Sequence, residues 1–471
     1  MIGDLKPYSE YKESGLPWLG QVPGHWSVSR IKTVLRETDH RSEDGEGTLL
    51  SLTRVRGLIP HRDMTDKMHS AKTLVGYKRY RTGQLVMNRM QAWSGMFGAG
   101  EIDGLVSPDY AVFDVLGGHS IKLVLERLKT PDLISQFALE SKGIGSGFNR
   151  LYTDRFGPIP ISLPPPDEQA AIVRFLDWAN GRLERAIRAK RKVIALLNEQ
   201  KQAIIHRAVT RGLDPDVPLK PSGIPWLGNI PQHWEVKRLG HAISLMTGFP
   251  FPSSGFSKEA DGVRLLRGIN VSPGGVRWDA TVHWKRAPAD GLDDFELTAG
   301  DVVLGMDRPI VGNGVRAAVV QKRDTPALLL QRVARLRPTA ALLTEYLMLL
   351  LQGRVFADYM APIFTGISVP HLSPQQIRDF RIGLPPVEEQ KAIVDSVGRD
   401  TKALGITISR LEHEIELLRE YRTRLVADVV TGKLDVREAA ARLPDEAAPE
   451  PLDDDAELAE ALDGEDEEAL A

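Results

Sequence analysis

The sequence SGLPWLGQVPGHWSVSRI at residues 14–31 returns as SGIPWLGNIPQHWEVKRL at residues 222–239, an offset of 208. Eleven of the eighteen positions are identical, including both tryptophans of each copy. A second block, LPPPDEQAAIV at 163–173, returns as LPPVEEQKAIV at 384–394 with an offset of 221. Because self-similarity at a fixed period indicates a repeated structural unit, the chain is predicted to contain two copies of one unit.

The two copies differ in length by 13 residues, and all of the difference falls between the two shared blocks. A weaker echo, Gly83-Gln-Leu-Val against Gly300-Asp-Val-Val, has an offset of 217 and divides this insertion in two. The shared residues are mostly Pro, Trp, Leu, Gly and Val, which serve packing rather than catalysis. The variable middles are free to meet different ligands. This pattern favours a scaffold that carries two recognition domains over a duplicated enzyme.

Each second block leads into a long stretch with helical character. Prolines precede it, acidic residues fill its first turn, and Gly212 and Pro215 end the first copy. These signals predict helices over 167–209 and 388–430. A helix of 43 residues is about 65 Å long at 1.5 Å per residue, and DNA half-sites one turn apart are separated by about 34–36 Å. Such helices are long enough to hold two domains on separate DNA segments.

Apolar residues in both helices alternate by four and three, which is the pattern of a coiled coil. Lys190 and Lys201 occupy seam positions, where a polar residue fixes the register at some loss of stability. Matched seams favour pairing within the chain over two separate amphipathic surface helices. Antiparallel pairing would place one domain at each end, under pseudo-two-fold symmetry. The seam positions are Leu183, Ile187, Lys190, Ile194, Leu197, Lys201 and Ile204, and, 221 residues later, Leu404, Ile408, Leu411, Ile415, Leu418, Arg422 and Leu425.

The length of 471 residues predicts two to four domains. The chain has no cysteine, which excludes disulfides, thiol catalysis and cysteine-ligated metals. The polar N-terminus predicts no signal peptide, and the most apolar stretch, 340–351, is too short to span a bilayer. A cytoplasmic protein without a membrane segment is therefore expected.

The net charge of −3 conceals an asymmetry. Residues 441–471 carry thirteen acidic residues and one arginine, so the rest of the chain has a net charge of +9. A basic body suits binding to a polyanion, although an ordinary solvated surface is an equal alternative. The acidic tail is predicted to be disordered, and DNA mimicry and self-solubilisation are both open roles for it.

Two WLGxxPxHW blocks, two LPPxxEQxAIV blocks before long helices, and a TxxLD sequence at each helix end resemble the specificity subunit of type I restriction–modification systems. The resemblance covers residues 1–440. It implies a mixed α/β (α+β) fold with two tandem target recognition domains, each followed by a long helix, and the two helices pair as an antiparallel coiled coil. Each domain would read one half of a bipartite DNA site, and the helices would set the gap between the halves.

The resemblance also implies partners and domain boundaries. The subunit would have no catalytic centre, metal or cofactor of its own. It would bind double-stranded DNA, two methyltransferase subunits that modify adenine with S-adenosylmethionine, and motor-nuclease subunits that use ATP and Mg, with no membrane involved. The implied boundaries are 1–165 for recognition domain 1, 166–215 for helical region 1, 216–386 for recognition domain 2, 387–440 for helical region 2, and 441–471 for the acidic tail.

Motifs for other chemistry are missing from the sequence. The Pro-Pro pairs follow Leu rather than the Asn or Asp of an adenine methyltransferase loop, and no GxxxxGK[ST] phosphate loop occurs. The glycine-rich stretch at 142–149 matches the second copy through Gly366, which indicates a structural turn. His25 and His233 lie in the shared blocks and are predicted to be packed structural residues. A stand-alone methyltransferase or nuclease, and a scaffold that binds proteins instead of DNA, remain the alternatives.

Arg, Lys, Asn and Gln side chains read base edges and hold phosphates. The variable middles contain basic and amide-rich stretches such as RVRGLIPHR at 54–62 and MNRMQAWSG at 87–95. Strand-like runs at 84–87 and 302–304 predict mixed α/β domains around them. For each single candidate, a solvated surface residue is the alternative. The candidate DNA contacts are Arg54, Arg56, Lys78, Arg79, Arg81, Asn88, Arg89 and Gln91, and, in the second copy, Arg264, Arg267, Asn270, Lys285, Arg286, Arg308, Asn313 and Arg316.

Overall fold

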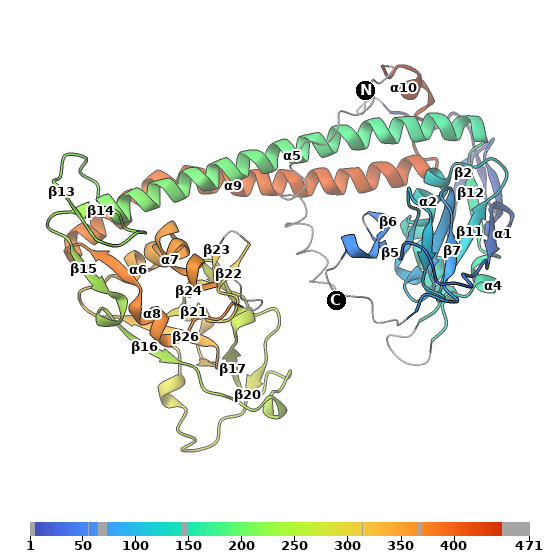
Figure 1. Cartoon of the computed structure of the whole chain (residues 1–471). Coiled ribbons are helices and arrows are strands. Elements are labelled where there is room, and N and C mark those ends of the chain that lie inside the picture. The colour runs from blue at the N-terminus through green and yellow to red at the C-terminus, as the bar shows by residue number, and fades with distance from the viewer. Residues whose placement is uncertain are drawn as a thin grey trace. The chain divides into compact units, whose positions relative to one another are not determined.

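The computed structural model describes residues 5–54, 56–64, 73–143, 149–312, 314–364 and 370–444 (Figure 1). The chain forms two compact units. The first combines residues up to Lys190 with those from His413 to the end of the described chain, and the second runs from Arg191 to Glu412. Each unit therefore contains one variable domain and one half of each long helix.

The first unit is built on an antiparallel sheet of order β4-β11-β8-β9. Its interior strand β8 is apolar on both faces, because Leu85 and Met87 join one core while Val86 joins another. Helices α2 and α3 lie beside this sheet and contribute Leu123, Val124 and Phe137 to the first core. The bounds are β4 (Leu35–Thr38), β8 (Gln84–Asn88), β9 (Phe97–Gly98), β11 (Tyr110–Val115), α2 (Ile121–Leu128) and α3 (Pro131–Glu140).

Short hairpins and ribbons surround this sheet. Strand β3 pairs with β12 and so joins the start of the domain to the segment that precedes the long helix. The β5–β6 hairpin covers the outer face of β8 through Leu50, Leu52 and Leu58. The bounds are β1 (Tyr11–Glu13), β2 (Gln21–Pro23), β3 (Ser27–Arg30), α1 (Ile31–Val34), β5 (Leu50–Thr53), β6 (Gly57–Pro60), β7 (Lys78–Tyr80), β10 (Gly104–Val106), α4 (Thr153–Phe156) and β12 (Pro160–Leu163).

The second unit repeats this plan with an antiparallel sheet of order β16-β26-β21-β24. Strand β21 takes the place of β8. The glycines just before these two strands, Gly83 and Gly300, have φ of 95° and 97°, a left-handed conformation that glycine adopts without strain. The predicted strands at 84–87 and 302–304 are confirmed. The bounds are β16 (Ile243–Thr247), β21 (Val302–Gly305), β24 (Ala317–Val319) and β26 (Val333–Pro338).

Helix α6 packs against β24 and β26, and the α6–α7 pair fills the core beneath this sheet. Among the described residues no single helix is long and apolar enough to span a membrane, although α6 and α7 meet that criterion when the bent pair is taken together. The remaining bounds are β13 (Leu219–Pro221), β14 (Asn229–Pro231), β15 (Glu235–Arg238), β17 (Val263–Leu266), β18 (Val271–Ser272), β19 (Gly275–Val276), β20 (His283–Trp284), β22 (Ile310–Val311), β23 (Gly314–Val315), β25 (Ala327–Leu329), α6 (Thr344–Gln352), α7 (Arg354–Phe364), α8 (Pro374–Asp379) and β27 (Arg381–Leu384).

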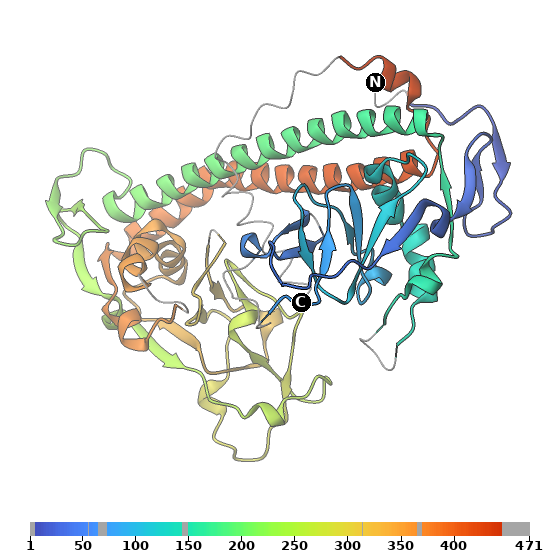
Figure 2. The same ribbon diagram turned by 45° about the vertical axis from the view of Figure 1, so that its right-hand side comes forward.

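The predicted long helices are present as α5 (Pro166–Arg211) and α9 (Val387–Val430). Figures 1 and 2 show the two helices side by side. In the first unit they are antiparallel, because Glu184 pairs with Arg422 and Lys190 Nζ lies 2.5 Å from Glu414 Oε2.

The predicted seam is the less exposed line of each helix. Leu183, Ile187, Ile408, Ile415 and Leu425 are buried, and the other seam residues are partly buried. The seam cations Lys190 and Arg422 each meet a glutamate of the opposite helix, which explains how a charged residue is accommodated there.

The helix ends complete the two cores. In the first unit, Val429 and Val430 at the end of α9 pack with the N-terminal domain, and Val436, Ala440 and Leu443 of the segment around α10 (Arg437–Ala441) extend this packing. In the second unit, Ile205, Ala208 and Val209 at the end of α5 join the core of the second domain. Each domain is therefore closed by the helix that follows the other domain in the sequence.

Candidate nucleic-acid interface

The shared His-Trp pairs anchor the first turn of each long helix. Trp26 Nε1 donates to Glu168 Oε1 at 3.0 Å, and His25 Nε2 lies 2.5 Å from Glu168 Oε2. In the second copy, Trp234 Nε1 lies 3.0 Å from Glu389 Oε1. His233 Nε2 is 2.7 Å from Glu389 Oε2. Both histidines have a structural hydrogen-bonding role, but the prediction that they are packed is wrong, because their side chains are 40% and 46% exposed.

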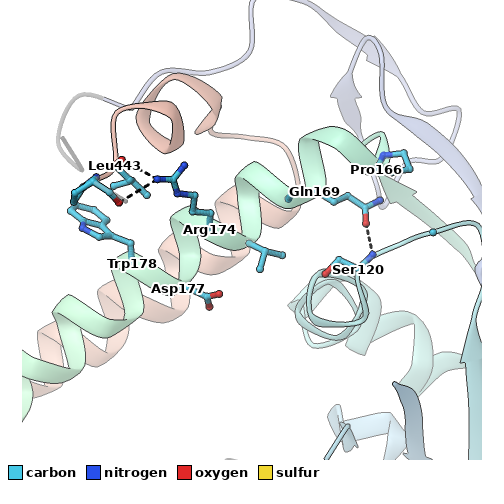
Figure 3. A pocket seen from close by; sticks show the side chains of 11 residues that line it. Ser120, Pro166, Gln169, Arg174, Asp177, Trp178 and Leu443 are labelled. Atoms are coloured by element: carbon cyan, nitrogen blue, oxygen red, sulfur yellow. Dashed lines mark hydrogen bonds between the residues drawn. The ribbon is translucent and has the colours of Figure 1, made fainter. Parts of the chain in front are cut away.

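The glutamine after each of these glutamates binds the domain from the other side. Gln169 Nε2 donates to Pro164 O at 2.8 Å, and Gln169 Oε1 accepts from Ser120 N at 2.8 Å (Figure 3). Gln390 repeats this by donating to Pro385 O at 2.9 Å and accepting from Leu343 N at 2.9 Å. The Glu-Gln dipeptide of each copy thus fixes the start of its long helix to the domain that precedes it.

The loops that follow the interior strands β8 and β21 are held in the same way in both domains. Leu151 N donates to Arg89 O at 2.9 Å in the first domain, and Leu372 N donates to Met306 O at 2.8 Å in the second. Leu151 and Leu372 match at offset 221, and Arg89 and Met306 match at offset 217. The two strand ends are therefore equivalent places, and different side chains project from them.

At the end of β8, several predicted residues come together. Arg54, in the turn between β5 and β6, donates to Ser94 O at 3.0 Å. Asn88 Nδ2 donates to Gln91 Oε1 at 3.0 Å. Trp93 is 42% exposed beside them. The sequence analysis quoted the stretch that contains Trp93 but did not select it, although a large exposed aromatic in an amide-rich loop is itself a recognition signal.

The flanking predicted residues are more constrained. Arg56 lies in the same turn as Arg54 and donates to Asp63 O at 3.2 Å. Arg89 is paired with Glu37 at 2.6 Å. Burial lowers the pKa of Lys129, the charge of Glu126 raises it, and the charge of Arg54 lowers it. Lys129, which was not selected from the sequence, therefore lies close enough to Arg54 for their charges to interact.

Arg79 and Arg81 lie elsewhere, at the start of β8. They line a recess of about 470 Å³ together with Arg36, His40 and Gln84. Since Gln84 begins β8 and Asn88 ends it, the predicted residues of the first domain form two groups at opposite ends of one strand.

Two of the predicted DNA contacts are buried side chains, so burial argues against them. Lys78 is 1% exposed, and its Nζ lies 3.3 Å from Asp39 Oδ1 and 3.6 Å from Glu37 Oε1. Asn270 is 2% exposed, accepts from Arg267 N at 3.1 Å and donates to Arg277 O at 2.9 Å. Both side chains support the interior of their domains and are removed from the candidate surface.

Other cations of the second domain are already engaged. Arg286 binds Asp290 and Asp293 at 2.6 Å and also Glu296. The hydrogen bonds that Arg286 donates to Asp290 are the largest cause of its raised pKa. A guanidinium with three carboxylate partners has little remaining attraction for a phosphate, so the structure argues against Arg286 as a contact.

The remaining predicted residues of this region differ in their contacts and in their exposure. Arg264 lies 4.4 Å over the ring of Trp278, and Arg267 donates to Ala280 O. The side chain of Lys285 is 83% exposed. Asn313 lies outside the described residues.

Arg308 and Arg316 lie at the end of β21, with two residues that the sequence analysis missed. His371 Nδ1 lies 2.6 Å from Asp307 Oδ1, and Arg332 Nη1 lies 3.2 Å from the same oxygen. The repeat itself offered a signal, because offset 221 aligns His371 with the basic residue Arg150. A strand end with three arginines and one histidine is suited to bind a polyanion.

The described part of the chain contains no group of three or more His, Asp or Glu side chains that could hold a metal ion. A recess of about 560 Å³ lies along the start of α5, where Arg174 donates to Leu443 O at 3.0 Å and Trp178 forms one wall (Figure 3). None of the predicted DNA contacts lines this recess.

No protein-family model matches the chain. The chain is 29% identical over 304 residues to the type I restriction enzyme MjaVIII specificity subunit of Methanocaldococcus jannaschii, a match that covers 64% of this chain and 68% of that protein. It is 30% identical over 244 residues to the type I restriction enzyme EcoAI specificity subunit of Escherichia coli, which covers 51% of this chain and 39% of that protein.

The chain is a homologue of type I restriction enzyme specificity subunits. The resemblance carried by the repeated blocks is therefore confirmed. A solved structure that describes complex assembly and conformational transition of a type I R-M system has the same fold, with a TM-score of 0.58 and 17% identity. That match covers 88% of this chain and 99% of the other. The two tandem domains with long helices fit the specificity-subunit fold, as predicted.

Proposed function

We propose that this chain is the sequence-specific DNA-binding subunit of a type I restriction–modification complex, and that each domain reads one half of a bipartite site. One observation carries the proposal: the two domains keep the same sheet and the same helix-start hydrogen bonds but differ at the equivalent strand ends. Two domains that recognise different DNA sequences need the same scaffold but different side chains on the DNA-contacting surface.

The chain has the role of a non-catalytic subunit, as its homologues do. We infer that chemistry resides in partner subunits, with S-adenosylmethionine used for adenine methylation and ATP and Mg for motor-driven cleavage. The subunit itself needs only to position these partners on DNA. A stand-alone methyltransferase or nuclease has no support in the homologues.

A recess along the two helices of the first unit supports docking of methyltransferase subunits. On α9, Leu417 is 49% exposed and Tyr421 is 41% exposed. Both line a recess of about 530 Å³ whose rim contains Lys190 and Arg424. Exposed apolar side chains next to charges are typical of a protein–protein contact. We propose this surface as part of the methyltransferase interface, and the domain boundaries and the cytoplasmic location given above remain predictions.

The test is a domain replacement read out by DNA methylation. Cells would carry the chain together with its methyltransferase subunit, and the methylated motif would be determined for the wild type and for a chain in which residues 36–150 come from another specificity subunit. One half of a bipartite motif should change while the other half and the gap stay constant. A motif in which both halves change, or neither does, would overturn the proposal.

A matched experiment separates DNA recognition from a pure protein scaffold. Binding of the complex to duplex DNA would be measured between 50 and 200 mM salt. Neutralising six to ten phosphates should lower the affinity about 10³- to 10⁵-fold over this range. Binding that is insensitive to salt would favour the protein-scaffold alternative.

A further inference from the structure

The backbone is strained where the second domain presents its arginines. Arg308 has φ of 43° and Arg332 has φ of 69°, a left-handed conformation that disfavours any side chain larger than glycine. The two residues are linked through the strand end, because Met306 N donates to Arg332 O at 2.9 Å. Strain of this kind persists only where the surroundings impose it, and it concentrates at binding sites.

The charges at this strand end are not balanced. Asp307 is occupied by His371 and Arg332, at 2.6 and 3.2 Å. No carboxylate in the described chain lies within ion-pair distance of Arg308 or Arg316. Burial lowers the pKa of Arg316, and the charge of Arg308 lowers it further. Two uncompensated neighbouring cations destabilise the free protein, and an electron-rich ligand would relieve their repulsion.

The two arginines differ in how firmly they are held. Arg316 is partly buried, and its backbone N and O are bonded to Pro309 O and Gly305 N, both at 2.8 Å. Its Cβ and Cδ pack 3.1 and 3.3 Å from the place where a Cβ on Gly305 would lie. Arg308 is exposed. Glycine at position 305 therefore lets the aliphatic stem of Arg316 pack closely against β21, which restricts this side chain more than the exposed Arg308.

An arginine whose stem is held by packing is suited to a base, and an exposed arginine is suited to a phosphate. Guanine presents two acceptors, O6 and N7, in the major groove, and the guanidinium fork donates to both. Adenine presents a donor beside its acceptor and cannot match this fork. A phosphate accepts from many directions and requires no such preorganisation.

We propose that Arg316 reads a guanine in the half-site of the second domain, and that Arg308 binds a neighbouring phosphate. This proposal rests on the proposed function. It gives the two arginines, eight positions apart on one strand end, separate roles that one pair of variants distinguishes.

The first experiment compares Arg316→Gln with Arg308→Gln in cells that carry the methyltransferase subunit. The half-site of the second domain is first identified by replacing residues 244–370. Arg316→Gln should relax the motif at one guanine of that half, whereas Arg308→Gln should lower the methylated fraction at all sites and leave the motif unchanged. If the wild type gives no bipartite motif, the proposed function fails. If it gives one that Arg316→Gln leaves intact, only the present proposal fails.

A second variant, Arg316→Lys, controls for loss of folding in Arg316→Gln. It keeps the charge and the aliphatic packing on Gly305 but lacks the fork, so it should relax the same guanine position. Thermal melting of each variant complex would report folding separately. Retention of full guanine preference by a folded Arg316→Lys complex would show that the guanidinium fork is not required and would overturn the bidentate contact.

The second experiment uses the purified complex with methyltransferase and a duplex in which that guanine is 7-deazaguanine, which lacks N7. Because O6 remains, one of the two hydrogen bonds of the bidentate contact is lost, and wild-type binding should weaken by up to about tenfold. The same replacement should have no further effect on Arg316→Gln. Equal weakening of both proteins would show that another residue reads the base, and would overturn the proposal.

Discussion

The two halves of this chain agree in their interiors and differ at their strand ends. Both tryptophans that bind the helix-start glutamates, Trp26 and Trp234, are 0% exposed. At equivalent places after β8 and β21, however, the first half presents Gln91 and the second presents Arg308. Interior positions are constrained by packing and hydrogen bonding in both copies, whereas the strand-end positions are constrained only by what they bind.

The comparison also shows that the two copies are not energetically identical. Glu168 accepts from Tyr8 at 2.5 Å in addition to its histidine and tryptophan, whereas Glu389 has the histidine and tryptophan alone among the described residues. Burial raises the pKa of the Tyr8 hydroxyl, and its hydrogen bond to Glu168 raises it further. The helix-start glutamate thus has more hydrogen-bond partners in the first copy than in the second.

Removal of the shared tryptophans has the largest expected effect. Trp26→Ala and Trp234→Ala each leave a cavity and remove one hydrogen bond to the helix-start glutamate, and each should lower the free energy of unfolding by about 3–5 kcal/mol. Urea denaturation of the two variants would measure this. If one variant loses less than half of the unfolding free energy that the other loses, the two tryptophans do not stabilise their domains equally.

The glycines at the helix ends come next. Both are left-handed, with φ of 71° at Gly212 and 78° at Gly432. A Cβ at Gly432 would lie 2.5 Å from Pro23 Cδ, whereas one at Gly212 would come no closer than 3.2 Å, to Glu389 Oε1. Gly212→Ala should therefore cost about 1–2 kcal/mol from backbone strain, and Gly432→Ala about 1–3 kcal/mol more from overpacking. Equal melting temperatures for the two variants would contradict this order.

Neutralisation of the anchoring glutamates should have a smaller, unequal effect. Glu168→Gln faces three donors with one oxygen and an amide, so it should cost about 1–3 kcal/mol. Glu389→Gln faces two donors and is more exposed, so its cost should be smaller. Denaturant midpoints of both variants test the ranking, and a more severe effect of Glu389→Gln would refute the importance of Tyr8.

The smallest effect concerns pH. Burial alone would raise the pKa of Asp435, but hydrogen bonds from Arg437 hold it below its ordinary value of 3.8. A depressed pKa contributes stability that is present above the ordinary value and is lost as pH falls through the folded value. The stability difference between wild type and Asp435→Asn should thus be constant near neutral pH and shrink below pH 3.8. A difference that grows on acidification would contradict the assignment.

Much of the shared scaffold could be predicted because local sequence patterns specify it. The repeated blocks predicted the duplication, proline and glycine predicted the helix ends, and the four-three spacing predicted the seam. The candidate surface could be predicted only in part. Lys78 and Tyr80 alternate with Arg79 along β7, so that Lys78 points inward, but a short basic stretch does not reveal which face of a strand is buried.

The sequence by itself determined that the chain is duplicated, that each copy ends in a long helix with a matched seam, and that the middles are the variable parts. The tertiary structure decided which variable side chains stand together: Arg308, Arg316, Arg332 and His371 come from separate segments. It also decided that the end of α9 closes the core of the first domain. The physical reason is that repeats and periodicity record short-range constraints, whereas burial and charge neighbours depend on contacts between segments far apart in the chain.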